Sequence, residues 1–241
     1  MPTGRAPNTA AAGCLLSGRI ADGPHPARLA AALAARHAPS AAFPVNYGHT
    51  ALAIALDLFR ARAPGRSEVL VLRPTFARAW CRRSPRPGLR AVAVAVGPDL
   101  NLTPAGGGGG ARPGHAGGRR APHVRLPGAD RRHRGTVLKQ AGVFLVDDAA
   151  QVVGETSEGR LLGTFGDVGL ISFAQSKAVV TGVRGSGGVL LVNRPEFEAD
   201  ARRACEALPL PRGRLRAFAY FVWNYLWAAR TGKTGYYLAR A

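Results

Sequence analysis

Two short apolar runs, each followed by polar side chains, constrain the fold of this chain more than any other feature. Residues 143–148 end in two carboxylates, and residues 168–173 are followed after a short gap by a lysine. Apolar runs of this length that are bounded by glycine are typical of buried parallel strands. Ligands of open α/β sheets bind at the carboxyl ends of such strands. We therefore expect one crevice to be lined by Asp148, Gln151, Ser172 and Lys177.

This set of side chains suits pyridoxal phosphate as a cofactor. The cofactor needs a lysine amine for a Schiff base, and a carboxylate that keeps its pyridine nitrogen protonated as an electron sink. It also needs hydrogen-bond donors for its phosphate and a polar group near its ring oxygen. Taken alone, a single lysine after a strand is usually a solvated side chain. The surrounding motifs favour the functional interpretation of Lys177.

Three motifs occur in register in this part of the chain: Asp-Asp-Ala-Ala-Gln at 147–151, Gly-Thr-Phe-Gly-Asp at 163–167 and Ser-Phe-Ala-Gln-Ser-Lys at 172–177. With them the sequence resembles the sugar aminotransferases of the DegT/DnrJ/EryC1/StrS family, in the fold type I superfamily of pyridoxal phosphate enzymes. The family pattern is an acidic pair with Ala-Ala-Gln or Ala-Ala-His, then Gly-Ser-Phe-Gly-Asp, then Ser-Phe-x-x-x-Lys. Several motifs in register are more specific than any one of them.

The resemblance implies a role for each matching residue. Lys177 would hold the cofactor and then carry protons between it and the substrate carbon. Asp148 would bond the pyridine nitrogen, with Asp147 as the preceding acid of the motif. Gln151 would bond the ring oxygen, and Ser172 the phosphate.

A second phosphate contact is expected where Asn-Tyr-Gly-His-Thr, residues 46–50, precedes a predicted helix at 51–62. The family has Ser-Gly-Thr here, and the aligned residues are Tyr47, Gly48 and His49. Only the glycine matches, so the hydroxyl of the family threonine is missing unless Thr50 supplies it. The backbone N–H groups that start a helix attract anions in any case. An ordinary helix cap is the alternative.

Phe76 is the candidate for stacking on the pyridine ring. It follows a predicted strand at 68–72, where the family has threonine followed by an aromatic residue. A phenylalanine of the hydrophobic core is the alternative interpretation.

The fold implied by the resemblance is α/β: a mostly parallel, seven-stranded-type sheet with flanking helices, the large domain of fold type I enzymes. Further strands are predicted at 89–96 and 189–192, and helices at 26–37, 195–208 and 215–230. We expect a loose N-terminal arm at 1–24, a cofactor-binding large domain at 25–193 and a helical remnant at 194–241. Relatives continue into a small C-terminal domain, so we expect an incomplete chain with weak or absent activity.

Residues 105–135 interrupt this pattern. They contain five consecutive glycines and seven arginines against one aspartate, without strand or helix periodicity. A structureless segment of this length is unusual inside a compact sheet. We expect either a disordered or frame-shifted segment, or a flexible basic linker that binds polyanions.

The formal net charge of +19 raises the possibility of nucleic-acid binding. Only three of the basic residues are lysines, and Arg, Ala, Gly and Pro are residues favoured by GC-rich codons. Compositional bias is therefore the preferred explanation. No apolar run reaches the roughly 18 to 20 residues of a membrane span. The three scattered cysteines indicate a reducing, cytoplasmic location and no metal site.

The function implied by the resemblance is transfer of an amino group, with glutamate as the expected donor, to a keto group of a nucleotide-linked sugar. Relatives usually form homodimers that share active sites. Two alternatives remain open at this point. They are a non-catalytic, degenerate relative that still binds the cofactor, and a basic protein associated with nucleic acid.

Overall fold

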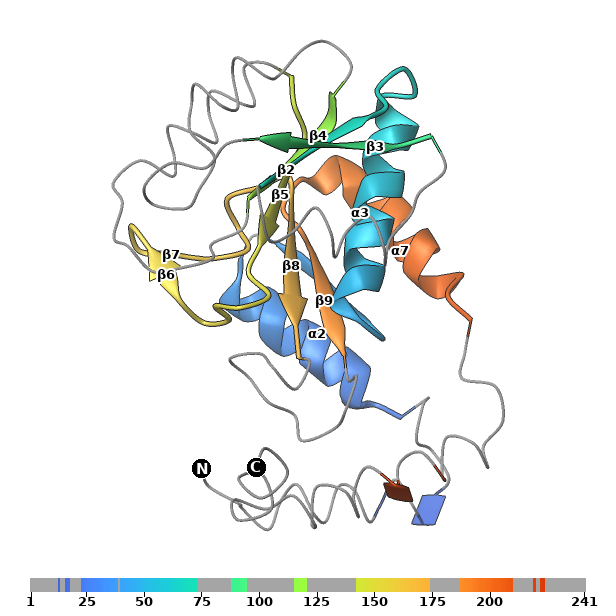
Figure 1. Ribbon diagram of the computed structural model, residues 1–241. Coiled ribbons are helices and arrows are strands. Elements are labelled where there is room, and N and C mark those ends of the chain that lie inside the picture. Colours follow the sequence, from blue (N-terminus) through green and yellow to red (C-terminus); the bar gives the residue numbers. More distant parts are fainter. Residues whose placement is uncertain are drawn as a thin grey trace, which may run out of the picture.

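The computed structural model describes residues 23–38, 40–72, 88–94, 115–120, 142–173 and 187–209, and six single residues near the two ends of the chain. Its centre is a seven-stranded sheet with the strand order β1-β9-β8-β5-β4-β2-β3 (Figure 1). The strands are β1 (Ala41–Val45), β2 (Glu68–Leu72), β3 (Arg90–Val94), β4 (His115–Arg120), β5 (Leu145–Asp148), β8 (Val168–Ser172) and β9 (Gly188–Val192).

The sheet is mixed but mostly parallel. Strands β3, β2, β4, β5 and β8 pair in parallel, and β9 pairs antiparallel with both β8 and β1. Strand β9 therefore runs against every other strand, while β1 points the same way as β5 and β8. The prediction of a mostly parallel, seven-stranded sheet is confirmed.

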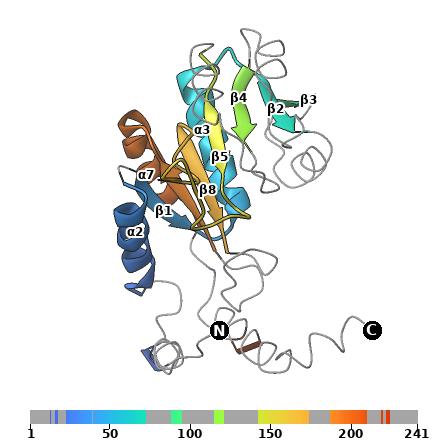
Figure 2. The same ribbon diagram turned by 90° about the vertical axis from the view of Figure 1, so that its left-hand side faces the viewer.

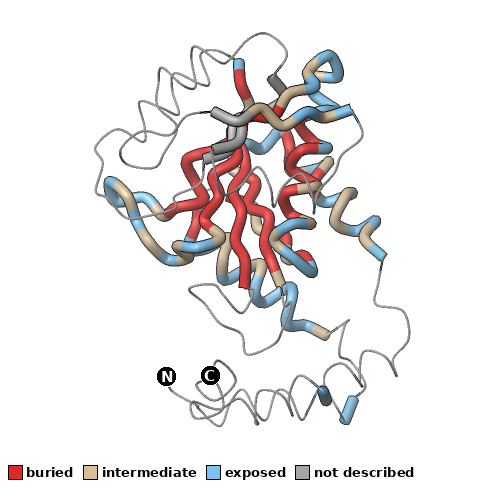
Figure 3. The backbone as a smooth tube through the Cα atoms, viewed as in Figure 1, coloured by how far each residue is buried: buried red, intermediate tan, exposed pale blue. Residues whose placement is uncertain are grey.

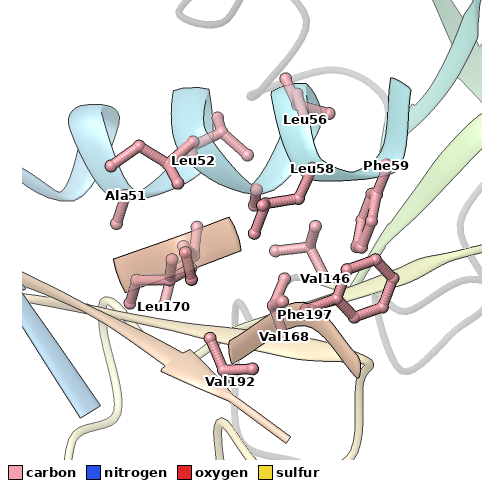
Figure 4. Packing of buried hydrophobic residues seen from close by; sticks show 14 of the residues in the cluster. Ala51, Leu52, Leu56, Leu58, Phe59, Val146, Val168, Leu170, Val192 and Phe197 are labelled. Carbon is pink, nitrogen blue, oxygen red and sulfur yellow. The ribbon is translucent and has the colours of Figure 1, made fainter. Parts of the chain in front are cut away.

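One face of the sheet is covered by helix α3 (Gly48–Arg62). Its apolar residues recur at helical spacing and meet strand residues of one parity, since alternate side chains of a strand share a face. Figure 4 shows Leu52 and Leu58 of α3 directed toward the strand residues Val168 and Leu170. Phe59 stacks on Phe144 with ring centroids 4.8 Å apart, which closes this core at the end of the helix.

The same face also receives the chain after β9. A short 3-10 helix η1 (Pro195–Phe197) leads into α7 (Glu198–Glu206), and both contribute to the α3 core. The Phe197 ring meets Phe59 edge-on at 5.6 Å. Buried residues follow β5, β8, β9 and the inner side of α3 (Figure 3).

Helix α2 (His25–Arg36) lies on the opposite face of the sheet (Figure 1 and Figure 2). Leu33 packs there against Val189 and Leu191, whose neighbours in β9 point to the α3 side. No residue of α2 is fully buried, so the helix covers this face loosely. Throughout this article the α3 side is called the front face and the α2 side the back face.

Most elements lie where the sequence predicts them. Strand β2 has the predicted bounds, β3 lies within the predicted strand, and α3 starts three residues earlier, at Gly48. The N-terminal arm and the predicted helix at 215–230 lie outside the described residues apart from single positions. No helix of the described part has both the length and the apolar character needed to cross a bilayer.

The sequence predicts no strand within 105–135, but the structure has β4 there, at His115–Arg120. This strand lies between β2 and β5 and pairs in parallel with both. Backbone hydrogen bonds of a central strand come from its neighbours on each side, so a segment without an apolar pattern can complete the ladder. The expectation of a structureless segment is wrong for these six residues.

A small hairpin of β6 (Thr156–Ser157) and β7 (Arg160–Leu161) follows the end of β5. Its two turn residues, Glu158 and Gly159, have positive φ of 52° and 73°. Such a turn favours Asn-Gly, because asparagine tolerates positive φ better than most other residues that have a β-carbon. We expect Glu158→Asn to raise the free energy of unfolding by about 0.5–1 kcal/mol, measured by urea denaturation. A decrease would show that Glu158 makes a contact worth more than the strain.

Candidate functional site

Three parts of the chain meet at one edge of the sheet, on its front face. Strands β5 and β8 end at Asp148 and Ser172, and helix α3 begins directly after β1, at the same edge. Val146 and Leu170 belong to the α3 core, and alternate residues of a strand share a face. Asp148 and Ser172 therefore also point to the α3 side.

The start of α3 packs closely against the end of β8. A β-carbon built on Gly48 would lie 3.0 Å from Cβ of Ser172 and 3.2 Å from its Oγ. The backbone of Gly48 also approaches Gly188, whose added β-carbon would lie 2.4 Å from the Gly48 nitrogen. Glycine at 48 and 188 thus allows the first turn of α3 to approach the Ser172 hydroxyl.

Backbone bonds fix this junction. The N–H of Gly187 donates to the carbonyl of Asn46 at 2.9 Å, and the N–H of Phe173 donates to the carbonyl of Gly187 at 3.1 Å. Tyr47 and Gly187 form an isolated parallel bridge. The glycine-rich entry into β9 therefore ties the turn before α3 to the end of β8.

The N-terminus of α3 has the character of an anion site. Its cap residue, Tyr47, is extended and makes no side-chain capping bond. The first N–H groups of a helix have no partner within it and carry the positive end of the helix dipole. Ser172, which is 6% exposed, adds a hydroxyl beside them. The arrangement suits a phosphate group.

The hydroxyl of Thr50 is not free to donate to a phosphate as the family threonine would. Its hydroxyl donates to Oδ1 of Asn46 at 2.6 Å, so its proton is directed to the preceding turn. The backbone N–H of Thr50 is also engaged, because it donates to the carbonyl of Tyr47 at 3.0 Å. Both donors of Thr50 are therefore directed to the preceding turn and not to a phosphate. Of the three candidates there, Gly48 has the clearest geometry, and His49 follows it in the first turn.

Asp148 lies at the site edge with 5% of its surface exposed. Its Oδ1 accepts the N–H of Ala150 at 3.0 Å, and the N–H of Ala149 donates to the carbonyl of Leu170 at 2.9 Å. The bond from Ala149 holds the end of β5 against β8, and the bond from Ala150 closes the turn after Asp148. A nearly buried carboxylate is costly unless it meets donors or a positive charge, which a protonated ring nitrogen would supply.

The remaining candidates are Gln151, Lys177 and Phe76. Gln151 is exposed, in the turn that follows β5. Lys177 and Phe76 lie outside the described residues, so their roles stay predictions. Within the described part of the chain no group of three or more metal-binding side chains occurs.

Sequence reasoning missed a polar network on the back face. Asp147, which precedes Asp148, is 1% exposed. Its Oδ2 accepts the N–H groups of Gly163 at 2.7 Å and Phe165 at 3.0 Å. Asn193 donates through Nδ2 to the carbonyls of Gly163 and Gly166, at 2.9 and 3.0 Å. The motif at 163–167 is therefore a loop held flat on the sheet. An asparagine directly after an apolar strand was the available signal.

A second buried carboxylate, Asp167, lies at the amino end of β5. Its Oδ2 accepts the N–H of Leu145 at 2.6 Å, and its Oδ1 pairs with Arg194 at 3.1 Å. Burial alone would lower the pKa of the Arg194 guanidinium, but its hydrogen bonds to Asp167 and Glu196 outweigh burial and raise it. Arg194 therefore stays charged beside the buried carboxylate.

Comparison with known proteins places this geometry in a family. Residues 130–210, which contain the ends of β5 and β8 and the loop between them, match the DegT/DnrJ/EryC1/StrS aminotransferase family. This segment is similar to the DegT/DnrJ/EryC1/StrS aminotransferases. The resemblance seen in the sequence motifs is confirmed. A curated relative, the UDP-N-acetyl-3-dehydro-alpha-D-glucosamine 3-aminotransferase of Acidithiobacillus ferrooxidans, is 36% identical over 66 residues, 27% of this chain and 17% of that enzyme.

Similar solved structures confirm the fold. The 3-amino-5-hydroxybenzoic acid synthase aligns over 84% of this chain and 51% of its own, with a TM-score of 0.70 and 25% identity. DesV of S. venezuelae, solved in complex with a ketimine intermediate, aligns over 82% and 52%, with a TM-score of 0.69 and 31% identity. The chain thus spans about half the length of these structures, with the fold type I sheet.

Proposed function

We propose that this chain binds pyridoxal phosphate at the front-face edge and transfers an amino group to a keto group of a nucleotide-linked sugar. The observation that carries the proposal is the convergence of Asp148, Ser172 and the start of α3 at one edge and on one face. This set matches the two ends of the cofactor: a carboxylate for a cationic ring nitrogen, and helix N–H groups with a hydroxyl for a phosphate.

When bound, the cofactor supplies an electron sink for the carbon that gains or loses nitrogen. The protein residues then have separate tasks. Asp148 keeps the ring nitrogen protonated, while Ser172 and the N–H groups around Gly48 and His49 orient the phosphate. Lys177 is assigned to holding the cofactor and to moving a proton at the substrate carbon. Gln151 is assigned to the ring oxygen, and Phe76 to stacking on the ring.

The substrate class follows from the relatives. The name of the Acidithiobacillus ferrooxidans relative describes amino transfer to a nucleotide-linked dehydro sugar. We propose a keto-sugar nucleotide as acceptor, with glutamate as donor and a homodimer as the working unit.

Two measurements on the purified chain test the proposal. Titration with pyridoxal phosphate should produce a saturable visible absorbance band, and incubation with glutamate and a dehydro-sugar nucleotide should yield 2-oxoglutarate and an amino sugar. A band without turnover would indicate the non-catalytic alternative. Absence of the band, from a chain with a folded circular dichroism spectrum, would contradict cofactor binding altogether.

Gly48→Ala tests the phosphate end of the site. The added methyl would lie 3.0 Å from Cβ of Ser172, closer than ordinary contact, so Ser172 must move away from the helix start. We expect the dissociation constant of pyridoxal phosphate to rise about tenfold, the equivalent of one hydrogen bond of about 1.4 kcal/mol. Absorbance titration measures it.

Gly65→Ala is the matched control, because Gly65 follows the other end of α3 and has no atom within 4 Å of an added β-carbon. It should leave cofactor affinity unchanged. Equal affinity of the Gly48→Ala and wild-type chains would exclude the start of α3 from the phosphate site.

A further inference from the structure

The two adjacent carboxylates at the end of β5 have different surroundings. Asp148 points to the front face, and Asp147 points to the back face, because neighbouring residues of a strand alternate. Asp147 is the more buried, with 1% of its surface exposed against 5% for Asp148. No role for Asp147 follows from the chemistry proposed above.

The back-face surroundings of Asp147 consist of backbone donors. Its Oδ2 accepts two N–H groups of the 163–166 loop, from Gly163 at 2.7 Å and from Phe165 at 3.0 Å. Charge-assisted bonds of this kind are stronger than neutral ones, and they offset the cost of burying a carboxylate. Asp147 is therefore anchored through its side chain, at the last step of the strand before Asp148.

The loop that binds Asp147 is itself rigidly held. Asn193 donates to the carbonyls of Gly163 and Gly166, and Ser40 donates to Oδ1 of Asn193 at 2.5 Å. An added β-carbon on Gly166 would lie 2.6 Å from the carbonyl oxygen of Leu145, so the loop is in direct contact with the backbone of β5. A carboxylate bound to such a loop cannot rotate without breaking several bonds.

We propose that Asp147 is a positioning residue, which fixes the end of β5 so that Asp148 faces the cofactor edge. The 163–166 loop acts from the back of the sheet as the base to which Asp147 is bonded. This inference rests on the proposed cofactor site for one of its two readouts only. The other readout concerns the position of Asp148 in the chain without cofactor.

The first readout is the dissociation constant of pyridoxal phosphate, obtained by absorbance titration of variants at a temperature where all are folded. Asp147→Ala should weaken binding at least tenfold, since Asp148 is no longer held toward the front face. Asp147→Asn should restore binding to within about threefold of wild type, because an amide oxygen can accept the same two N–H groups.

Asp167→Ala is the matched control. Asp167 is also a buried carboxylate that accepts a backbone N–H of β5, but at Leu145, the opposite end of the strand. It should lower the melting temperature as Asp147→Ala does and change the dissociation constant by less than threefold. Equal weakening by both alanine variants would overturn the inference, because general destabilisation would then explain the effect.

The second readout is hydrogen exchange of the Ala150 amide in the cofactor-free chain, measured by NMR. This N–H donates to Oδ1 of Asp148 at 3.0 Å, so its protection reports where the Asp148 carboxylate lies. Protection should fall at least tenfold in Asp147→Ala and stay near wild type in Asp167→Ala. If the wild-type chain binds no cofactor, the proposed function fails and this readout alone decides: unchanged protection in Asp147→Ala overturns the inference.

Discussion

Replacement of Lys177 by alanine is expected to lower amino transfer by at least roughly a thousandfold, the largest functional effect we predict. General acid–base catalysis by one positioned group contributes about 10²–10⁴ in rate, and the same amine is assigned to holding the cofactor. The variant should retain weak cofactor binding through Asp148 and Ser172. Formation of 2-oxoglutarate from glutamate measures the loss.

The chain offers a sharp control, because its lysines are Lys139, Lys177 and Lys233. Borohydride reduction of the loaded chain should fix the cofactor to one lysine, identified by peptide mass spectrometry. Lys139→Ala and Lys233→Ala should keep both label and turnover. A label on Lys139 or Lys233 in the wild-type chain would disprove the assignment of Lys177.

Gly169→Ala is expected to lower the free energy of unfolding more than any other substitution that we predict. A β-carbon at this position of β8 would lie 2.0 Å from the carbonyl oxygen of Gly163, where the 163–166 loop rests on the back face. The atoms that the added methyl group would meet all belong to the backbone of Gly163, so no flexible side chain can move aside to relieve the clash. A loss of at least roughly 3 kcal/mol is expected, against a total stability of about 5–15 kcal/mol.

Urea denaturation of Gly169→Ala and Gly65→Ala measures this loss. The Gly65 variant should remain within about 0.5 kcal/mol of wild type, because the added methyl meets open space. A Gly169→Ala chain with the denaturation midpoint of wild type would mean that the 163–166 loop does not lie on β8. The polar network around Asp147 and Asn193 would then lose its basis as well.

The strands next to the site are predictable from sequence, and the reason is local. Strands β8 and β9 are buried on both faces and appear as mostly apolar runs, and β5 continues the apolar run 143–146 into two aspartates. The polar residues at the carboxyl ends of the parallel strands β5 and β8 predict the site edge, because the ends of neighbouring parallel strands lie together. Asp148 and Ser172 became candidates in this way.

Other features depend on contacts that no local pattern reveals. Strand β4 lacks an apolar run and is defined by pairing with β2 and β5. Asp147 is the same residue type as its neighbour Asp148, and only the alternation of the strand places one carboxylate on the back face and the other on the front face. The bond from Thr50 to Asn46 is equally hidden, because it depends on how the chain turns before α3.

The strand order has a consequence for synthesis of the protein on the ribosome. Strand β1 and helix α3 are made early, yet β1 pairs with β9, which ends at Val192. Until that residue has left the exit tunnel, the apolar side of α3 has no completed β8–β9 surface to cover. Nascent chains paused before this point would expose the apolar side of α3, and we expect chaperones to bind them.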